Sequence, residues 1–269
     1  MINLPPLLSE YEPTRATLHA YALVLSTIAR THGIPHPKWW HVSLAVRPDG
    51  LVTDPIPLGD GGAVAIAMDL KRHEIVFRAS DGDLRVIDMK ELPTATEVGR
   101  LLIAACSAHG LENTYDRERF GSDEPRVYEP EAASAYFDTF TAVATVFERH
   151  RATLGDRVSP VQLWPHGFDL SFEWFGTRTI EHDREMLPAQ LNLGFYPGGV
   201  EPYFYSNPWP FDDALATTAL PDGARWHTEG WSGALMPYDT VRTEAEPGAA
   251  LSGFAKAVFA AARPSLDTP

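Results

Sequence analysis

The sequence predicts an α+β protein of two similar halves, each with a helix, a run of antiparallel strands and a closing helix. Three observations support this: helical periodicity at the ends of each half, short β-rich runs between them, and the return of the same order after residue 130. The expected halves are residues 1–112 and 131–269, with a polar connection at 113–130. Residue identity between the halves is slight, so a single domain without duplication is the alternative.

The first half is expected to begin and end with a helix. Residues 13–31 carry apolar side chains at spacings of three and four, the period of an amphipathic helix. Thr94 and Glu97 form a capping-box pattern before a second helix that runs to about His109. Five β-rich runs between these helices predict an antiparallel meander: WWHVSLAV, GLVTDPIP, VAIAMDL, EIVFRA and LRVIDM.

The second half repeats this order. Residues 131–150 place aromatic and aliphatic side chains on one helical face. Pro247 stands at a first-turn position and begins a closing helix. The strand-like runs between these helices are DLSFEWF, AQLNLGF, EPYFYS and WSGALMPY.

Charge and cysteine content limit the classes of partner. The 22 basic and 36 acidic side chains give a net charge of −14, which repels phosphate backbones and anionic lipids, so neither nucleic acid nor membrane is expected as a partner. Cys106 is the single cysteine, and its apolar helical surroundings predict a buried structural thiol. The amino terminus lacks the pattern of a signal peptide, so we expect a cytoplasmic location.

The segment VQLWPHGFDL, residues 161–170, is the strongest site candidate. On a regular strand His166 and Asp169 would point to opposite faces, so they cooperate only if the chain bends, and Pro165 and Gly167 are suited to a turn or a bulge. A carboxylate beside an imidazole raises its basicity and fixes its tautomer, as in a general base or a metal ligand. The alternative is a histidine that only caps the turn.

A second histidine lies in the alternating run WWHVSLAV. Alternation places Trp40 toward the core and His41 on the more polar face, open to solvent or to a cleft. When the first expected strands of the two halves are aligned, Trp40 and His41 correspond to Trp164 and His166. We therefore expect the two histidines to face one cleft shared by the halves.

Residues 194–211 combine seven aromatic side chains with prolines and glycines, a composition suited to the wall of a small-molecule pocket. On an extended strand Glu201, Tyr203 and Tyr205 would share a face. A surface carboxylate beside core-packing aromatics is the alternative. Tyr238, in MPYDTVR, is a weaker candidate for a ligand contact, since the dipeptide Tyr238-Asp239 also suits the start of a turn.

The sequence leaves the cofactor unknown. A divalent metal is one option, with mixed nitrogen and oxygen ligands drawn from His41, His166, Asp169 and Glu201. The glycine-rich stretches LGDGGAV and GFYPGG lack the context of a phosphate or dinucleotide loop, so no nucleotide cofactor is expected.

Five segments along the chain carry a family resemblance. They are LPPL, WWHVSLAV with GLVTDPIP, SPVQLWPHGFDLSF, GFYPGG with EPYFYS, and LMPYDTVR. In these segments, and in their order, the chain resembles an uncharacterised bacterial family known as domain of unknown function 5996. The resemblance implies family membership over nearly the whole chain and no particular reaction.

These patterns favour an enzyme acting on a small organic molecule by acid–base or metal-assisted chemistry in the shared cleft. The acid–base or ligand roles fall to His166, Asp169, His41 and Glu201. Substrate contacts fall to Trp40, Trp164, Tyr203, Tyr205 and Tyr238. A non-catalytic small-molecule-binding or sensing protein is the first alternative, and a structural or interaction module is the second.

Overall fold

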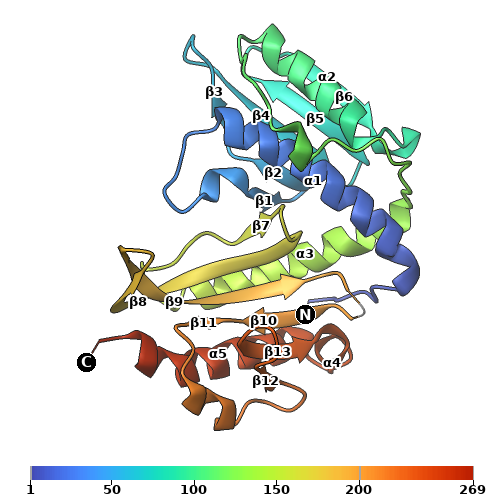
Figure 1. Cartoon of the computed structure of the whole chain (residues 1–269). Helices are drawn as coiled ribbons and strands as arrows, with labels where there is room; N and C mark the ends of the chain where they lie inside the picture. The colour runs from blue at the N-terminus through green and yellow to red at the C-terminus, as the bar shows by residue number, and fades with distance from the viewer. Residues whose placement is uncertain (1, 200, 269) are drawn as a thin grey trace. The chain divides into compact units, whose positions relative to one another are not determined.

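The computed structural model describes residues 2–199 and 201–268 (Figure 1). It divides into two units, each with its own core. The first unit comprises Leu7–Phe137 and Gln162–Phe168, and the second comprises Met1–Pro6, Asp138–Val161 and Asp169–Pro269. Helices and antiparallel strands occur in both units, so the α+β class is confirmed. The internal duplication and the shared cleft stay predictions.

Two long helices belong to the first unit, and both were expected. Helix α1 spans Glu12–His32, and helix α2 spans Ala95–Ala108. The capping box is confirmed, because the Thr94 hydroxyl accepts from the Glu97 backbone and the Glu97 carboxylate accepts from the Thr94 backbone. Short 3₁₀ turns lie at Ser9–Tyr11, Met89–Glu91 and Arg117–Arg119.

The strands of the first unit form the expected antiparallel meander. They are β1 (Leu44–Arg47), β2 (Gly50–Thr53), β3 (Ile56–Pro57), β4 (Ala63–Asp69), β5 (Glu74–Ala79) and β6 (Leu84–Asp88). The pairing order is β1-β2-β4-β5-β6, and β3 pairs with β4. Strand β7 (Gln162–Trp164) pairs with β1 at Leu44 and Leu163, which brings a distant segment into this unit.

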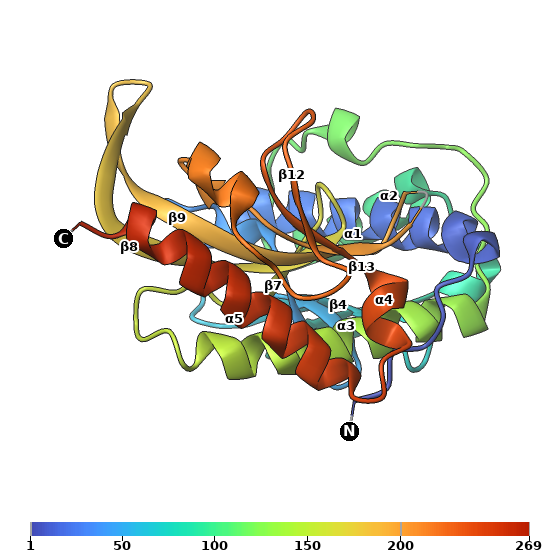
Figure 2. The same ribbon diagram turned by 90° about the horizontal axis from the view of Figure 1, so that it is seen from below.

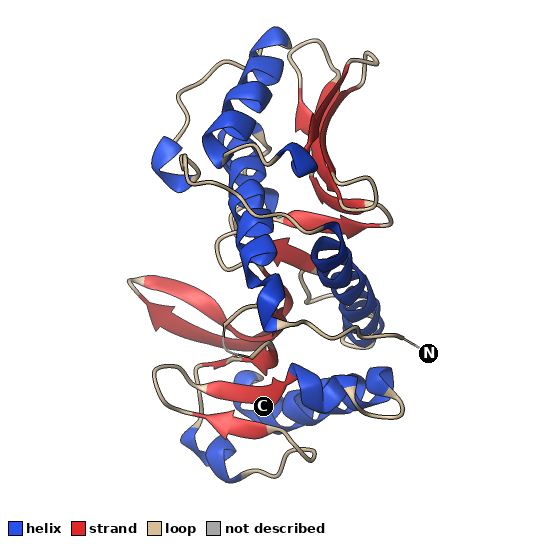
Figure 3. Cartoon of the chain, turned by 90° about the vertical axis from the view of Figure 1, so that its right-hand side faces the viewer, coloured by secondary structure: helices blue, strands red, loops and turns tan. Residues whose placement is uncertain are grey.

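The core of the first unit lies between its strands and its helices. Figure 3 shows these helices beside the curved layer of strands. Leu18 and Leu25 of α1 and Ile66 of β4 are completely buried. Cys106 of α2 is also fully buried, as expected for a structural thiol, and burial raises the pKa of this thiol to about 11. Among the described residues no helix combines the length and apolarity needed to cross a bilayer.

Residues 39–43 differ from the prediction. The sequence pattern indicated a strand from Trp39 onward, but Trp40–Val42 form a 3₁₀ turn and β1 begins only at Leu44. Local hydrogen bonds compete with the strand here: the Ser43 hydroxyl donates to the Trp40 carbonyl, and the His36 backbone donates to Nδ1 of His41. His41 is consequently buried, with 6% exposure, and is not open to solvent, the first of the two expected options.

The second unit contains the remaining strands and helices. Its strands are β8 (Asp169–His182), β9 (Glu185–Tyr196), β10 (Tyr203–Ser206), β11 (Pro208–Trp209), β12 (Arg225–His227) and β13 (Gly233–Pro237). Its helices are α4 (Tyr238–Arg242) and α5 (Pro247–Leu266), with most of α3 (Pro130–Arg151) and a 3₁₀ turn at Asp213–Thr217. The strand order is β12-β13-β10-β9-β8, all antiparallel, with β11 beside β9.

Helices α3 and α5 cover one face of this sheet (Figure 2). Aromatic contacts fix them: Phe140 of α3 meets Phe195 of β9, and Phe259 of α5 meets Trp174 of β8. Because side chains alternate along a strand, the neighbours of these buried residues point to the opposite face. Tyr203 and Tyr205 are such neighbours, on either side of the fully buried Phe204.

His150 of α3 gives the core of the second unit a predicted pH dependence. It is 6% exposed, its Nδ1 has no hydrogen-bond partner among the described residues, and burial together with the charge of Lys256 lowers its pKa to about 4. Between pH 6.5 and about 4 the unfolded chain binds a proton that the folded chain does not. The free energy of unfolding therefore falls as the pH drops through this window, by about 3 kcal/mol.

His150→Phe is expected to remove this pH dependence. The free energy of unfolding of the variant minus that of wild type should therefore be larger at pH 5 than at pH 7.5. Urea unfolding at the two pH values measures the difference. His182→Phe is the matched control, because His182 is largely exposed in β8 and should leave the pH dependence unchanged. Equal pH dependence in wild type and His150→Phe would contradict the prediction.

Candidate functional site

The bend predicted at residues 165–168 is confirmed as a turn. The Phe168 backbone donates to the Trp164 carbonyl at 2.8 Å. The left-handed residue is Phe168, with φ of 56°, and not Gly167. Phe168 is fully buried and stacks on His19 of α1 at 5.6 Å between ring centres, so burial of the ring offsets the backbone strain. This anchoring leaves His166 exposed on the outer side of the turn.

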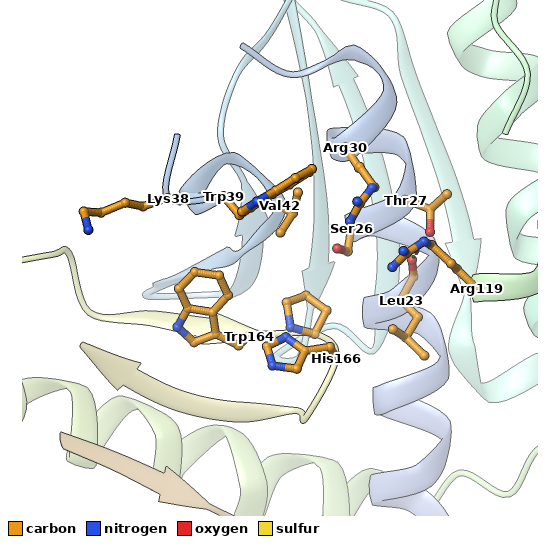
Figure 4. A pocket seen from close by; sticks show the side chains of 11 residues that line it. Leu23, Ser26, Thr27, Arg30, Lys38, Trp39, Val42, Arg119, Trp164 and His166 are labelled. Atoms are coloured by element: carbon orange, nitrogen blue, oxygen red, sulfur yellow. Dashed lines mark hydrogen bonds between the residues drawn. The ribbon is translucent and has the colours of Figure 1, made fainter. Parts of the chain in front are cut away.

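His166 and Trp164 line a cavity of about 420 Å³ in the first unit, here called the basic cavity (Figure 4). The remaining walls come from α1, from Lys38, Trp39 and Val42 at the 3₁₀ turn Trp40–Val42, and from the 3₁₀ turn that contains Arg119. In Figure 4, Trp39 and Arg30 lie along one side, and Trp164 and His166 lie along the other. The lining residues are Leu23, Ser26, Thr27, Arg30, Lys38, Trp39, Val42, Arg119, Trp164, Pro165 and His166.

The basic cavity concentrates positive charge. Arg30, Lys38 and Arg119 contribute three cations, and none of the described residues that line it carries a carboxylate. Arg119 pairs with Asp116 of its own turn, Nε to Oδ2 at 2.9 Å. The guanidinium carbon of Arg30 lies 4.3 Å from the centre of the Trp39 ring, a cation–π contact. The local charge is thus opposite in sign to the net charge of −14.

Trp39 is held in an uncommon conformation. Its φ is 60°, in the left-handed region that bulky residues seldom occupy, and its side chain is 50% exposed. Such strain persists only where the surroundings maintain it, and it is frequent at binding sites. Here Arg30 and His41 both stack on the indole, which presents a large apolar surface at the basic cavity.

A second cavity, of about 250 Å³, lies in the second unit and is here called the tyrosine cavity. Its lining residues are Asp169, Tyr196, Tyr203, Tyr205, Asn207 and Trp231. The Tyr203 ring centre is 5.5 Å from that of Tyr196, 6.1 Å from that of Tyr205 and 6.5 Å from that of Trp231. Tyr203 and Tyr205 therefore share a face of β10, as the sequence predicted.

Tyr205 reaches Asp169 across the intervening strand β9. Its hydroxyl donates a short hydrogen bond to Oδ2 of Asp169, and the residue of β9 that faces it is Gly194. A Cβ at position 194 would clash with the Tyr205 ring, so glycine is what lets the ring lie flat over the strand. Burial, followed by the charge of Asp169, raises the pKa of Tyr205 well above its usual value, so the hydroxyl keeps its proton.

Several sequence-predicted site residues lie elsewhere. Glu201 is exposed just before β10 and is not among the residues that line the tyrosine cavity. His41 lines a separate cavity of about 310 Å³ beside Asp54, and burial lowers its pKa. Trp40 stacks on His36 with ring centres 4.2 Å apart.

Tyr238 has the environment of a core residue. It is 1% exposed, its hydroxyl donates to the Pro5 carbonyl, and it is 3.1 Å from the Thr139 hydroxyl. Its ring also packs against Phe195 and Phe204. This packing favours the structural alternative over the expected ligand contact.

The predicted pair of His166 and Asp169 is divided between the cavities. His166 lines the basic cavity of the first unit, and Asp169 lines the tyrosine cavity of the second. Their cooperation stays a prediction. No group of three or more His, Cys, Asp or Glu side chains within residues 2–199 and 201–268 could hold a metal ion, so the geometry adds no support to the metal hypothesis.

Sequence reasoning missed most of the charged and aromatic lining. Arg30 lies in the last turn of α1, where a basic residue is ordinary because it complements the helix dipole. Trp39 was interpreted as part of a strand, and Arg119 and Trp231 lie far along the chain from the other lining residues. Two local signals found part of the lining: the segment 161–170 gave Trp164, His166 and Asp169, and the aromatic richness of residues 194–211 gave Tyr203 and Tyr205.

Comparison with known proteins places the chain by sequence. The family described as a family of unknown function, DUF5996, matches residues 4–267. The chain belongs to this family. The match spans both units of the DUF5996 fold and both cavities. No curated protein and no solved structure matches the chain.

Gly194→Ala is expected to lower the free energy of unfolding of this DUF5996 chain by about 1–3 kcal/mol, because the added methyl group displaces Tyr205 from Asp169. Urea or thermal unfolding measures the effect. Gly253→Ala is the matched control: Gly253 lies in α5 with open space around it, so alanine should stabilise the helix by about 0.5–1 kcal/mol.

A double-mutant cycle tests the mechanism. In a Tyr205→Leu background the cost of Gly194→Ala should fall by at least about 0.5 kcal/mol, because the ring that clashes with the methyl group is gone. An unchanged cost in that background would show that the methyl group clashes with something other than Tyr205.

Proposed function

We propose that this protein binds a small organic anion with a planar apolar part in the basic cavity. The observation that supports this most is the composition of the lining: Arg30, Lys38 and Arg119 occur there with Trp39 and Trp164, in a chain of net charge −14. Cations that line a cavity with no carboxylate in its lining lower the energy of an anion bound there.

The geometry of Arg30 suits recognition of a carboxylate or a phosphate. A guanidinium presents paired N–H donors to two oxygens at once, and its contact with Trp39 restrains it before a ligand arrives. Preorganisation of this kind reduces the entropy lost on binding. Ser26, one turn before Arg30 on α1, adds a hydroxyl to the same wall.

The two indoles and the cavity size indicate the rest of the ligand. A volume of about 420 Å³ lies within the usual range for small-molecule sites, so a ligand of one or two rings fits. Trp39 is half exposed, which leaves apolar ring surface available to a planar group. A ligand that suits both the cationic and the indole side chains of the lining is an aromatic or heterocyclic carboxylate, sulfonate or phosphate.

Catalysis by His166 is the second candidate function, and the exposure of this imidazole on a turn that lines the basic cavity favours it. In this version His166 transfers a proton to or from the bound anion as general acid or base. The enzyme hypothesis from the sequence also used Asp169, His41 and Glu201. Since none of these three lines the basic cavity, the proposal rests on His166 alone.

Binding is testable with simple probes. Benzoate and phenyl phosphate should change the tryptophan fluorescence saturably, and benzyl alcohol, which lacks the charge, should bind at least about 10-fold more weakly. Arg30→Gln should weaken benzoate or phenyl phosphate binding at least about 10-fold, by loss of a charged hydrogen-bond donor. Arg47→Gln is the control, because Arg47 is exposed in β1 and does not line the cavity.

Two results would contradict the binding proposal. One is equal affinity for benzyl alcohol and benzoate, which would show that charge contributes nothing. The other is an equal loss of affinity in Arg30→Gln and Arg47→Gln, which would show a general surface effect and not a site.

His166→Gln separates binding from catalysis. The variant should keep the affinity for the tightest anionic probe within about threefold, because the cationic lining is intact. If the protein is an enzyme, conversion of that probe, followed by NMR, should fall at least about 100-fold in the variant. Equal conversion by both proteins would refute a role for His166, and no conversion by wild type would leave binding as the function.

A further inference from the structure

The tyrosine cavity has a composition unlike that of the basic cavity. Four of its six described lining residues are aromatic, one is the carboxylate Asp169, and none is basic. The antiparallel register explains the grouping: Tyr203 pairs with Tyr196, and Tyr205 pairs with Gly194. Trp231 completes the wall from the segment just before β13.

The aromatic rings remain accessible. Tyr196, Tyr203 and Trp231 are each only partly buried where they line this cavity. Ring faces carry negative electrostatic potential, and several rings around one small space attract a cation more strongly than a neutral group. The nearby carboxylate of Asp169 acts in the same direction.

Two hydrogen-bond donors of the cavity already have partners. Tyr205 donates to Asp169, and Nδ2 of Asn207 donates to the Ser232 carbonyl at 3.2 Å. A primary ammonium needs three acceptors to replace its hydration. A quaternary ammonium needs none and loses little hydration on entry, so the aromatic rings and the charge of Asp169 are enough to bind it.

We propose that the tyrosine cavity is a second ligand site, which binds a small quaternary ammonium group by cation–π contacts with Tyr196, Tyr203 and Trp231 and by the charge of Asp169. The volume of about 250 Å³ suits a trimethylammonium headgroup and little more. This site belongs to the second unit and shares no lining residue with the basic cavity.

The first experiment compares choline with 3,3-dimethyl-1-butanol, its neutral isostere, by isothermal titration calorimetry and tryptophan fluorescence on the full chain. Choline and tetramethylammonium should bind saturably. The isostere should bind at least about 10-fold more weakly, and methylammonium should also be weaker than tetramethylammonium. Equal binding of choline and its isostere, or no choline binding in the millimolar range, would overturn the proposal.

Variants locate the site. Tyr203→Leu removes a ring face and should weaken choline binding at least about 10-fold, and Tyr203→Phe keeps the ring and should change it less than threefold. Asp169→Asn should also weaken it, and Asp183→Asn is the charge control, because Asp183 is 92% exposed at the tip between β8 and β9.

The outcomes separate this site from the proposed function. Tyr203→Leu should leave benzoate binding unchanged, because Tyr203 does not line the basic cavity. A wild-type urea unfolding transition shows that the second unit of the variant is folded. Equal choline affinity in wild type and Tyr203→Leu, or an equal effect of Asp169→Asn and Asp183→Asn, would place the cation somewhere else on the acidic surface and refute the assignment.

Discussion

Alternation of side chains along β8, β9 and β10 is the constraint on which the arrangement of the second unit depends. One set of alternating residues is buried against the helices: Phe172 and Phe195 contact α3, and Trp174 contacts α5. The other set must then occupy the uncovered face, where Asp169 and Tyr205 meet. Core packing and the tyrosine cavity are therefore two results of one register, and a slip by one residue would exchange them.

The two cavities have opposite electrostatic character within one acidic chain. In the basic cavity Arg30 stacks on Trp39, and in the tyrosine cavity Tyr205 is bonded to Asp169. In each case an aromatic ring holds a charged group in place. The charge of the lining therefore differs between the two cavities, although the chain as a whole has a net charge of −14.

Elements with a strong local signal could be predicted from the sequence. The capping box of Thr94 and Glu97 and the shared face of Tyr203 and Tyr205 depend only on neighbouring residues. His41 could not be placed, because hydrogen bonds from nearby residues replace the strand with a 3₁₀ turn and bury the imidazole.

The candidate sites were predictable only in part, because they depend on contacts between residues that are distant in the sequence. Asp169 was identified as a candidate, but its bond to Tyr205 joins residues 36 positions apart, and no periodicity reports such a contact. Likewise Arg30, Arg119 and His166 come together only through the packing of distant segments of the first unit. Patterns in a sequence reveal which face a residue takes, and tertiary contacts decide what lies opposite.

The contact between Gly194 and Tyr205 also constrains how the sequence can change over evolutionary time. A side chain at position 194 and a ring at position 205 exclude each other, so the two positions cannot vary independently. A lineage that keeps the tyrosine must keep the glycine, and one that gains a side chain at 194 must first lose the ring. Among relatives, these two positions should therefore covary, and together they mark the chains that retain the bond to Asp169.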